Sequence, residues 1–366
     1  MNFPSFKRCL TAFLFTFVVS AIVCTPLLAR GTSVHVEPLK FPVQLSNGQD
    51  HSLAGFLFFQ PENEKNCFKK KKQKQVLKCL RKGLKNRTLQ VLVHGFSYNH
   101  TYWDTKRVND VDYSYAQFMA NQGFDVLALD LLGTGASSVP NGDLLNINES
   151  ALTLTQVLTS LRSKKNNPIN EGFQKIALVG HSVGTVTAVF TLGMHPEAAE
   201  VLVATGWSYA PHEVLLNPLL VEQALGGANS YIRFPSEERE RLFYFSKSAD
   251  LDVIAFDNAH LADKFSRGIL SQGLPLLQAL ALGDLKQIKL FSRVDQVAVP
   301  VLIQLGEFDL LIAPPRFPDL ERNLYAGSSD VTLQILESMG HSFNLHENNT
   351  QSWTRINQWI EQRLGK

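Results

Sequence analysis

The chain has 366 residues, of which 45% are hydrophobic and 19% are charged, and its formal net charge is +2 at pH 7. This balance is typical of a globular protein of one or two domains with a large core, and it excludes a disordered or fibrous chain. No nucleic-acid partner is expected.

The N-terminus has the pattern of a secretory signal peptide. Lys7 and Arg8 precede an apolar run over residues 10–23, and small residues follow it. We therefore expect residues 1–31 to be cleaved and the protein to be secreted or extracytoplasmic. The apolar run is shorter than the 18 to 20 residues typical of a membrane span, so an anchor formed by an uncleaved segment is the alternative.

Cleavage would leave two cysteines, Cys67 and Cys79. In an oxidising compartment we expect them to form a disulfide, and two free thiols are the alternative. Glycosylation acceptor sequences also agree with secretion from a eukaryotic cell. They occur at Asn86, Asn99, Asn148 and Asn348.

A strongly basic stretch surrounds these cysteines. Residues 65–87 carry eleven basic side chains and no acidic one, so the rest of the chain has a net charge of −9. We expect residues 61–87 to be a cationic hairpin, inserted between two strands, that attracts an anionic surface or polymer. A solvated loop without a partner is the alternative. The most basic part consists of Lys69, Lys70, Lys71 and Lys72.

Short apolar runs predict eight strands. The first two read as an antiparallel hairpin around "SNGQD", and from residue 89 the runs alternate with stretches of helical length, which is typical of a parallel sheet. An amphipathic C-terminal helix is expected over residues 352–365. The strands are predicted at residues 41–45, 53–59, 89–95, 124–130, 175–180, 199–206, 299–306 and 331–337.

Residues 208–293 contain no convincing strand, only helical patterns such as "SEERERLFYF" and "LPLLQALAL". We expect them to form a helical cap above the carboxyl edge of the sheet, where such sheets bind ligands, with a hydrophobic pocket beneath it. Residues 32–207 and 294–366 would then form an α/β core.

A serine lies at the sharp turn between a strand and a helix. In "KIALVGHSVGTVTAVF", Ser182 stands between Gly180 and Gly184, after a buried strand and before a helix. This is the context in which a GxSxG pattern presents a nucleophile. A serine hydroxyl needs a base, an acid that orients the base, and donors for the oxyanion.

Candidates for these roles follow later strands. Asp309 follows the seventh strand in "LGEFD", where Glu307 is its nearest rival. His341 follows the eighth strand in "SMGHSFNLH". We favour His341 over His346 as the base because it is nearer the strand end and Gly340 lets the backbone turn, and we expect His346 to pack against the final helix.

Backbone amides are the candidate oxyanion donors. The third strand ends at His94 and Gly95, so the amide of Phe96 and the amide of Val183 after the serine are the two candidates. His181 is interpreted as structural. Trp207 and His260 either contact substrate or have packing roles.

These motifs resemble those of the α/β-hydrolase superfamily over nearly the whole mature chain. They are "HGFSYNHTYWD", "DLLGTGASS", "GHSVG", "GEFD" and "GHS", in that order. The chain is most similar to secreted esterase-like or lipase-like members with a helical cap. The resemblance implies an α/β-hydrolase fold with a mostly parallel eight-stranded sheet flanked by helices.

The resemblance also implies a function. Ser182 is expected to be the nucleophile, His341 the general base and acid, and Asp309 the orienting carboxylate, in a serine hydrolase that cleaves carboxylic esters through an acyl-enzyme. An amide or thioester hydrolase, an acyltransferase, or a non-catalytic binding protein of this fold are the alternatives. No cofactor is expected, and no metal, since no residue cluster has ligand spacing. The substrate is expected to be a small ester with an apolar acyl part.

Overall fold

The computed structural model describes most of the chain after the N-terminal segment, and the expected signal peptide over residues 1–31 lies outside the described residues. So do Lys71 and the acceptor Asn86. The described residues are 33–366 except 62–63, 68, 71, 83, 85–86, 213–220, 223–224 and 315–317.

An eight-stranded sheet forms the centre of the fold, in the order β1-β2-β6-β3-β7-β8-β11-β12. The β1–β2 and β2–β6 pairs are antiparallel and the others are parallel, which confirms all eight predicted strands and the N-terminal hairpin. The strands are β1 His35–Gln44, β2 Asp50–Phe59, β3 Leu89–Val93, β6 Asp125–Asp130, β7 Ile176–His181, β8 Val201–Thr205, β11 Val301–Gly306 and β12 Val331–Leu336.

The burial of each strand explains its sequence. Every residue of β3, β6, β7, β8 and β11 is buried, because helices cover both faces of the parallel part of the sheet, and these strands are continuous apolar runs. The edge strand β1 instead alternates between buried and exposed residues, so only one of its faces meets the core.

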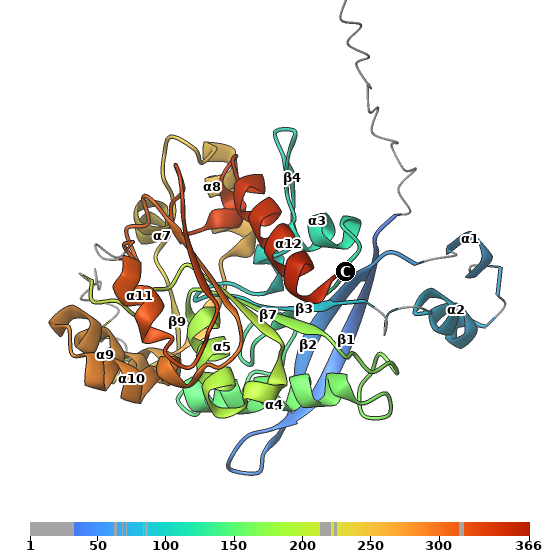
Figure 1. Cartoon of the computed structure of the whole chain (residues 1–366), viewed down its shortest axis with the longest axis horizontal. Coiled ribbons are helices and arrows are strands. Elements are labelled where there is room, and N and C mark those ends of the chain that lie inside the picture. The colour runs from blue at the N-terminus through green and yellow to red at the C-terminus, as the bar shows by residue number, and fades with distance from the viewer. Residues whose placement is uncertain are drawn as a thin grey trace, which may run out of the picture. The chain divides into compact units, whose positions relative to one another are not determined.

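Helices lie on both faces of the sheet (Figure 1). The cluster on one face includes α4 and α5, and the cluster on the other includes α3 and α12. The predicted amphipathic helix is present as α12, which buries Trp353, Ile356, Trp359 and Ile360, while Leu364 is half-buried. The fully described helices outside residues 208–293 are α1 Glu64–Cys67, α2 Gln73–Leu80, η2 His100–Tyr102, α3 Tyr115–Asn121, α4 Ile147–Arg162, α5 Val183–Met194, η3 Pro196–Ala198, η5 Val294–Gln296, α11 Pro318–Leu324, η6 Phe343–Leu345 and α12 Thr350–Leu364.

Residues 208–293, which we call the insert, connect β8 to β11. The expectation that they contain no strand is wrong, because β9 and β10 pair as an antiparallel ribbon. Each strand has only three residues, too few to leave a period-two pattern in the sequence. The described elements are β9 Tyr231–Arg233, α7 Ser236–Phe243, α8 Leu251–Phe256, the π-helix η4 Asp257–Leu261, β10 Lys264–Ser266, α9 Arg267–Leu282 and α10 Leu285–Ser292.

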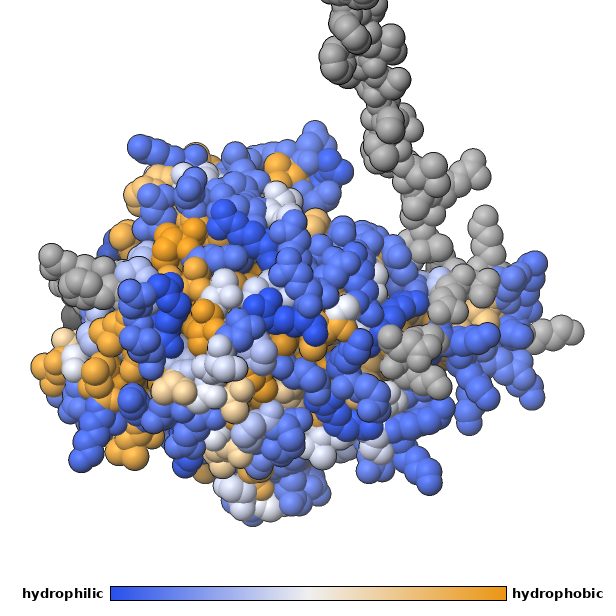
Figure 2. Space-filling model, viewed as in Figure 1, coloured by the Kyte–Doolittle hydropathy of each residue, from blue (hydrophilic) through white to orange (hydrophobic). Residues whose placement is uncertain are grey.

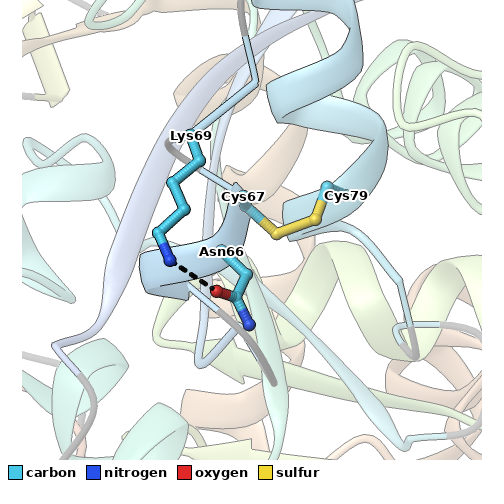
Figure 3. The surroundings of a disulfide bond; sticks show 4 residues. All are labelled: Asn66, Cys67, Lys69 and Cys79. Atoms are coloured by element: carbon cyan, nitrogen blue, oxygen red, sulfur yellow. Dashed lines mark hydrogen bonds between the residues drawn. A yellow bond between two sulfur atoms is a disulfide. The ribbon is translucent and has the colours of Figure 1, made fainter.

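The basic segment between β2 and β3 is helical, so the expected hairpin is wrong. Val76 and Leu80 lie on the inner side of α2 at helical spacing, whereas Lys74 and Lys78 are exposed. The expected disulfide between Cys67 and Cys79 is present, with a Cα–Cα distance of 5.4 Å (Figure 3).

A second short ribbon, also missed in the sequence, lies between β3 and α3. It consists of β4 Thr105–Val108 and β5 Val111–Tyr113. Asn109 and Asp110 connect them, both with positive φ, as a tight two-residue hairpin turn requires. Among the described residues, no helix is long and apolar enough to span a bilayer.

Candidate active site

Ser182 occupies the sharp turn between β7 and α5, and its backbone conformation is strained, with φ 55° and ψ −123°. The flanking glycines allow this turn because neighbouring backbone leaves no room for a side chain. A Cβ on Gly180 would lie 2.6 Å from the Cα of Thr185, and one on Gly184 would lie 2.2 Å from the oxygen of Val93. The GxSxG pattern is therefore a packing requirement of this turn.

His341 and Asp309 are in direct contact. The Nδ1 atom of His341 donates to Oδ2 of Asp309 at 2.7 Å, and both side chains are almost completely buried. The other carboxylate oxygen of Asp309 accepts the amides of Leu311 and Ile312 at 2.9 and 2.7 Å. These bonds fix the carboxylate, which in turn fixes the orientation of the imidazole.

Gly340 does not have the role that the sequence suggested. Its φ is not in the left-handed region, so the turn before His341 does not depend on backbone freedom at this position. A Cβ on Gly340 would instead lie 2.7 Å from the nitrogen of Phe245 and 2.8 Å from the oxygen of Phe243. A glycine is needed because the insert passes close to this loop.

The end of β8 connects Ser182 to His341. The amide of Ser182 donates to the oxygen of Thr205 at 2.8 Å. The next residue, Gly206, has φ 62°, and a Cβ there would lie 3.3 Å from Cε1 of His341. The serine turn and the His341–Asp309 pair therefore lie together at the carboxyl edge of the sheet.

The two candidate oxyanion donors lie beside the serine. Phe96 and Val183 line the same cavity as Ser182, and a Cβ on Gly95 would lie 2.9 Å from the Cβ of Ser182. Within the described part of the chain, neither the Phe96 amide nor the Val183 amide donates to another protein group. Val183 begins α5, where amides have no acceptor within the helix and the helix dipole favours negative charge.

His94 stabilises the turn that carries Phe96. Its Nδ1 donates to the oxygen of Gly95 at 2.8 Å, and its Nε2 accepts the amide of Leu131 at 3.0 Å. Burial lowers the pKa of His94, so the ring is neutral and its Nε2 can accept.

The rival residues have other partners. Glu307 is exposed and accepts the amide of Ser338 at 2.9 Å. His346, the rival base, is buried and has partners in two segments. Its Nε2 accepts the amides of Phe245 and Gly340 at 3.1 and 3.0 Å, and burial lowers its pKa to about 4. It therefore links the insert to the loop that carries His341.

His181 is buried and stacks on Tyr102, with ring centroids 4.6 Å apart. Its Nδ1 lies 3.1 Å from Oγ1 of Thr205, and burial holds its pKa well below the usual value. These contacts agree with the structural interpretation. Of the two residues left open, Trp207 lines the cavity at Ser182, whereas His260 is exposed and its ring lies 4.7 Å from that of Phe256.

The cavity next to Ser182 is mostly apolar and has a volume of about 130 Å³. Val186 and Phe190 of α5 form one wall, and residues of the insert, including Ile269 and Leu276 of α9, form another. The sequence predicted a helix here but not which of its residues face the serine, because α9 is apolar on much of its surface.

Hydrophobic side chains continue from this cavity to the surface. Figure 2 shows them over α9 and α10, at the lower left of the view. Phe291 lines the cavity and is also 38% exposed. Exposed neighbours on the same two helices are Leu282, Leu285 and Leu290.

The amides of Gly135 and Ala136 donate to the carboxylates of Asp263 and Asp130 at 2.8 Å, so the "GTG" turn does not offer them to a phosphate. Among the described side chains, no group of three or more His, Cys, Asp or Glu could hold a metal ion.

Comparison with known families identifies this arrangement. The sequence profile of the Alpha/beta hydrolase family matches residues 90–351. The chain belongs to the alpha/beta hydrolase family. No curated protein matches the sequence of this hydrolase.

Solved structures of this fold include several enzymes. A thermophilic esterase from Thermogutta terrifontis is 16% identical with a TM-score of 0.57, covering 89% of this chain and 98% of its own. A monoacylglycerol lipase from Paleococcus ferrophilus is 14% identical with a TM-score of 0.54, covering 90% and 99%. An enol-lactonase from Burkholderia xenovorans is 14% identical with a TM-score of 0.56, covering 87% and 99%. At these identities the similarity establishes the fold.

Proposed function

We propose that this alpha/beta hydrolase is a serine hydrolase that cleaves carboxylic esters through an acyl-enzyme. The observation that carries the proposal is the buried 2.7 Å hydrogen bond from His341 to Asp309 beside the strained turn at Ser182. With Nδ1 committed to the carboxylate, Nε2 is the nitrogen that remains to accept the serine proton.

In the first half of the reaction, Oγ of Ser182 attacks the ester carbonyl carbon while Nε2 of His341 takes the hydroxyl proton. The negative charge that forms on the carbonyl oxygen accepts hydrogen bonds from the amides of Phe96 and Val183. One such donor typically contributes about 10²- to 10³-fold to the rate. As the carbon–oxygen bond to the alcohol breaks, His341 returns the proton to the leaving oxygen.

In the second half, water enters and His341 removes a proton from it. The resulting hydroxide attacks the acyl carbon, and the same two amides again hold the oxyanion. The bond to Oγ of Ser182 then breaks, the serine recovers its proton from His341, and the carboxylic acid leaves. Asp309 stays ionised throughout and stabilises the transient imidazolium.

The apolar cavity supports an ester with an apolar acyl part as the substrate. Hydrocarbon groups gain about 0.8 kcal/mol for each methylene buried in such a site. The insert, which supplies much of the cavity wall, would act as a cap that limits the length and shape of the acyl chain.

The disulfide supports an extracytoplasmic protein, because such bonds persist in oxidising compartments. The acceptor asparagines differ in accessibility. The Nδ2 atoms of Asn99 and Asn348 donate to Asp263 and to the oxygen of Glu337, both at 2.9 Å. Asn148 is exposed, so we propose it as the glycosylated position if the protein enters a eukaryotic secretory pathway.

Active-site labelling tests the proposed function. A fluorophosphonate probe should label the mature protein, and Ser182→Ala should abolish labelling, whereas persistent labelling of that variant would show that another nucleophile reacts. His341→Ala should lower ester turnover by about 10⁴- to 10⁶-fold. His346→Ala is the matched histidine control, and a loss of that size in this variant alone would assign the base to His346.

A further inference from the structure

The insert contains a fully buried ion pair. Arg239 on α7 and Asp257 at the start of η4 both have no exposed surface, and Nη2 of the arginine donates to the two carboxylate oxygens at 2.5 and 2.6 Å. Burying two charges is costly unless their remaining hydrogen-bonding groups are also satisfied. Asn258 and Tyr244 of the insert supply part of this satisfaction, and the other partners, Ser97 and Tyr98, lie in the loop that carries Phe96.

Arg239 reaches the loop of the candidate oxyanion donor. Its Nη1 donates to the oxygen of Ser97 at 3.3 Å and also to Oγ of Ser97. The amide of Asp263, also in the insert, donates to the same carbonyl oxygen at 2.8 Å. The insert thus provides both donors to the residue that directly follows Phe96.

Ser97 needs this support because its φ is 60°, a conformation that residues other than glycine rarely adopt. Such a conformation persists only where its surroundings enforce it. Since Ser97 and Phe96 share a peptide unit, a relaxation of Ser97 would move the end of the turn that aims the Phe96 amide at the substrate.

Asp257 reaches the loop of the candidate base. Its Oδ2 accepts the hydroxyls of Tyr244 at 2.5 Å and Tyr98 at 3.2 Å. The Tyr98 hydroxyl lies 2.8 Å from Oγ of Ser342, the residue after His341. The amide of Ser342 donates to the oxygen of Phe243 in α7 at 2.9 Å.

Aromatic contacts complete the same connection. The guanidinium of Arg239 lies over the rings of Tyr98 and Phe243, 4.6 and 5.0 Å from their centroids. The ring of Phe243 lies 5.4 Å from that of His341. The buried pair is therefore connected to both loops. Arg239 contacts Ser97, the neighbour of Phe96, and Asp257 reaches Ser342, the neighbour of His341, through Tyr98.

We propose that Arg239 and Asp257 are positioning residues that hold the Phe96 amide and the His341 loop in the geometry needed for the transition state. This inference rests on the proposed ester hydrolysis. Neither side chain touches the cavity at Ser182, so the pair acts through Ser97 and Tyr98 and not on the substrate directly.

The test replaces both charges together, because removing one alone would leave the other buried without its partner. The double variant Arg239→Met with Asp257→Leu keeps similar side-chain volume and removes the contacts to Ser97 and Tyr98. The control is Arg87→Met with Asp125→Leu. That pair has a 3.0 Å contact and a fully buried carboxylate. Asp125 is the first residue of β6, so the pair lies at the amino end of the strand, away from the carboxyl ends that carry the candidate site.

Kinetics with a p-nitrophenyl ester and inhibition by a trifluoromethyl ketone, which mimics the tetrahedral intermediate, are the readouts. For Arg239→Met with Asp257→Leu we expect kcat to fall by about 10- to 100-fold and the inhibition constant of the ketone to rise in parallel, because misplacement of catalytic groups by about 1 Å costs up to about 10²-fold. The KM should change by less than about threefold, since the cavity is untouched.

A folded double variant whose kcat equals that of the control variant would overturn the proposal. If the double variant does not fold, Tyr98→Phe decides, because it removes only the hydroxyl that joins Asp257 to Ser342. A wild-type kcat in Tyr98→Phe would then reject the positioning role, and a loss of about tenfold would support it. Failure of the proposed function would look different, since the wild-type protein itself would neither hydrolyse esters nor react with the fluorophosphonate.

Discussion

Gly95 lies so close to Ser182 that a Cβ on residue 95 would stand 2.9 Å from the Cβ of the serine and 3.0 Å from the oxygen of His181. The end of β3 and the turn after β7 therefore share a space that admits no side chain. This close approach brings Phe96 to the same cavity as Ser182.

Gly95→Ala should consequently lower kcat by about 10²-fold or more, because the added methyl pushes the Phe96 amide away from the oxyanion. Gly226→Ala is the control, since a Cβ there meets nothing within 4 Å. The measurement is kcat for a p-nitrophenyl ester, together with circular dichroism to confirm folding. Equal turnover in the two variants would show that the Phe96 amide is not an oxyanion donor.

Gly273→Leu should shorten the acyl chains that the enzyme accepts. Gly273 lines the cavity on α9, and an added Cβ would point into open space, so the larger side chain can enter the cavity without disturbing the helix. The loss of two buried methylenes, at about 0.8 kcal/mol each, would lower the preference for long over short chains by about tenfold. The ratio of kcat/KM for octanoate and acetate esters measures this, with Gly226→Leu as the control.

Glu321→Gln should change how stability depends on pH. Glu321 of α11 is buried and accepts the amide of Tyr209 at 2.8 Å and the hydroxyl of Ser208 at 2.7 Å, at the start of the insert. Burial raises its pKa to about 7. Above pH 4.5 the unfolded chain therefore releases the Glu321 proton, while the folded protein keeps it up to about pH 7. The stabilisation that comes from holding this proton is lost as pH rises through 7.

Glutamine keeps the accepting oxygen but does not titrate. The free energy of unfolding of Glu321→Gln minus that of the wild type should therefore increase from pH 5 to pH 8. The expected increase is up to about 3 kcal/mol. Urea unfolding at the two pH values gives this difference. The same free-energy difference between the two proteins at both pH values would mean that Glu321 titrates normally.

The basic segment provides a test of the expected anionic partner. Lys69, Lys70 and Lys72 are exposed, and none of these three forms an ion pair with a described acidic side chain. Changing all four lysines at positions 69–72 to glutamine should weaken binding to anionic vesicles or heparin, more strongly at low salt than at high salt. A control of equal charge change replaces four exposed lysines elsewhere, Lys40, Lys165, Lys247 and Lys286. Equal binding by the two variants would show that the basic segment has no specific role in binding anionic surfaces.

The sheet could be predicted because its central strands are continuous apolar runs, a direct consequence of burial on both faces. The pairing of Asp309 with His341 could be predicted from strand ends alone, since the carboxyl ends of parallel strands meet at one edge. The ribbons β4–β5 and β9–β10 could not. Their strands have three or four residues, and β9 ends at Arg233 whereas β10 begins only at Lys264.

The burial of Arg239 was also beyond sequence reasoning. It stands in "SEERERLF", where neighbouring charges indicate a solvated helix face, and its partner Asp257 follows eighteen residues later. The basic segment was misjudged for a related reason. Its lysines suggested an exposed hairpin, while the spacing of Val76 and Leu80 favours a helix with one buried side.

The dependence of Ser97 on Arg239 and Asp263 limits how this protein can be re-engineered. Excising residues 208–293 to obtain a minimal catalyst would remove both donors from a carbonyl at the edge of the active site. A graft of the corresponding region from another hydrolase would meet the same difficulty. Any such chimera must therefore supply new hydrogen-bond donors to the carbonyl oxygen of residue 97, whatever pocket it is designed to create.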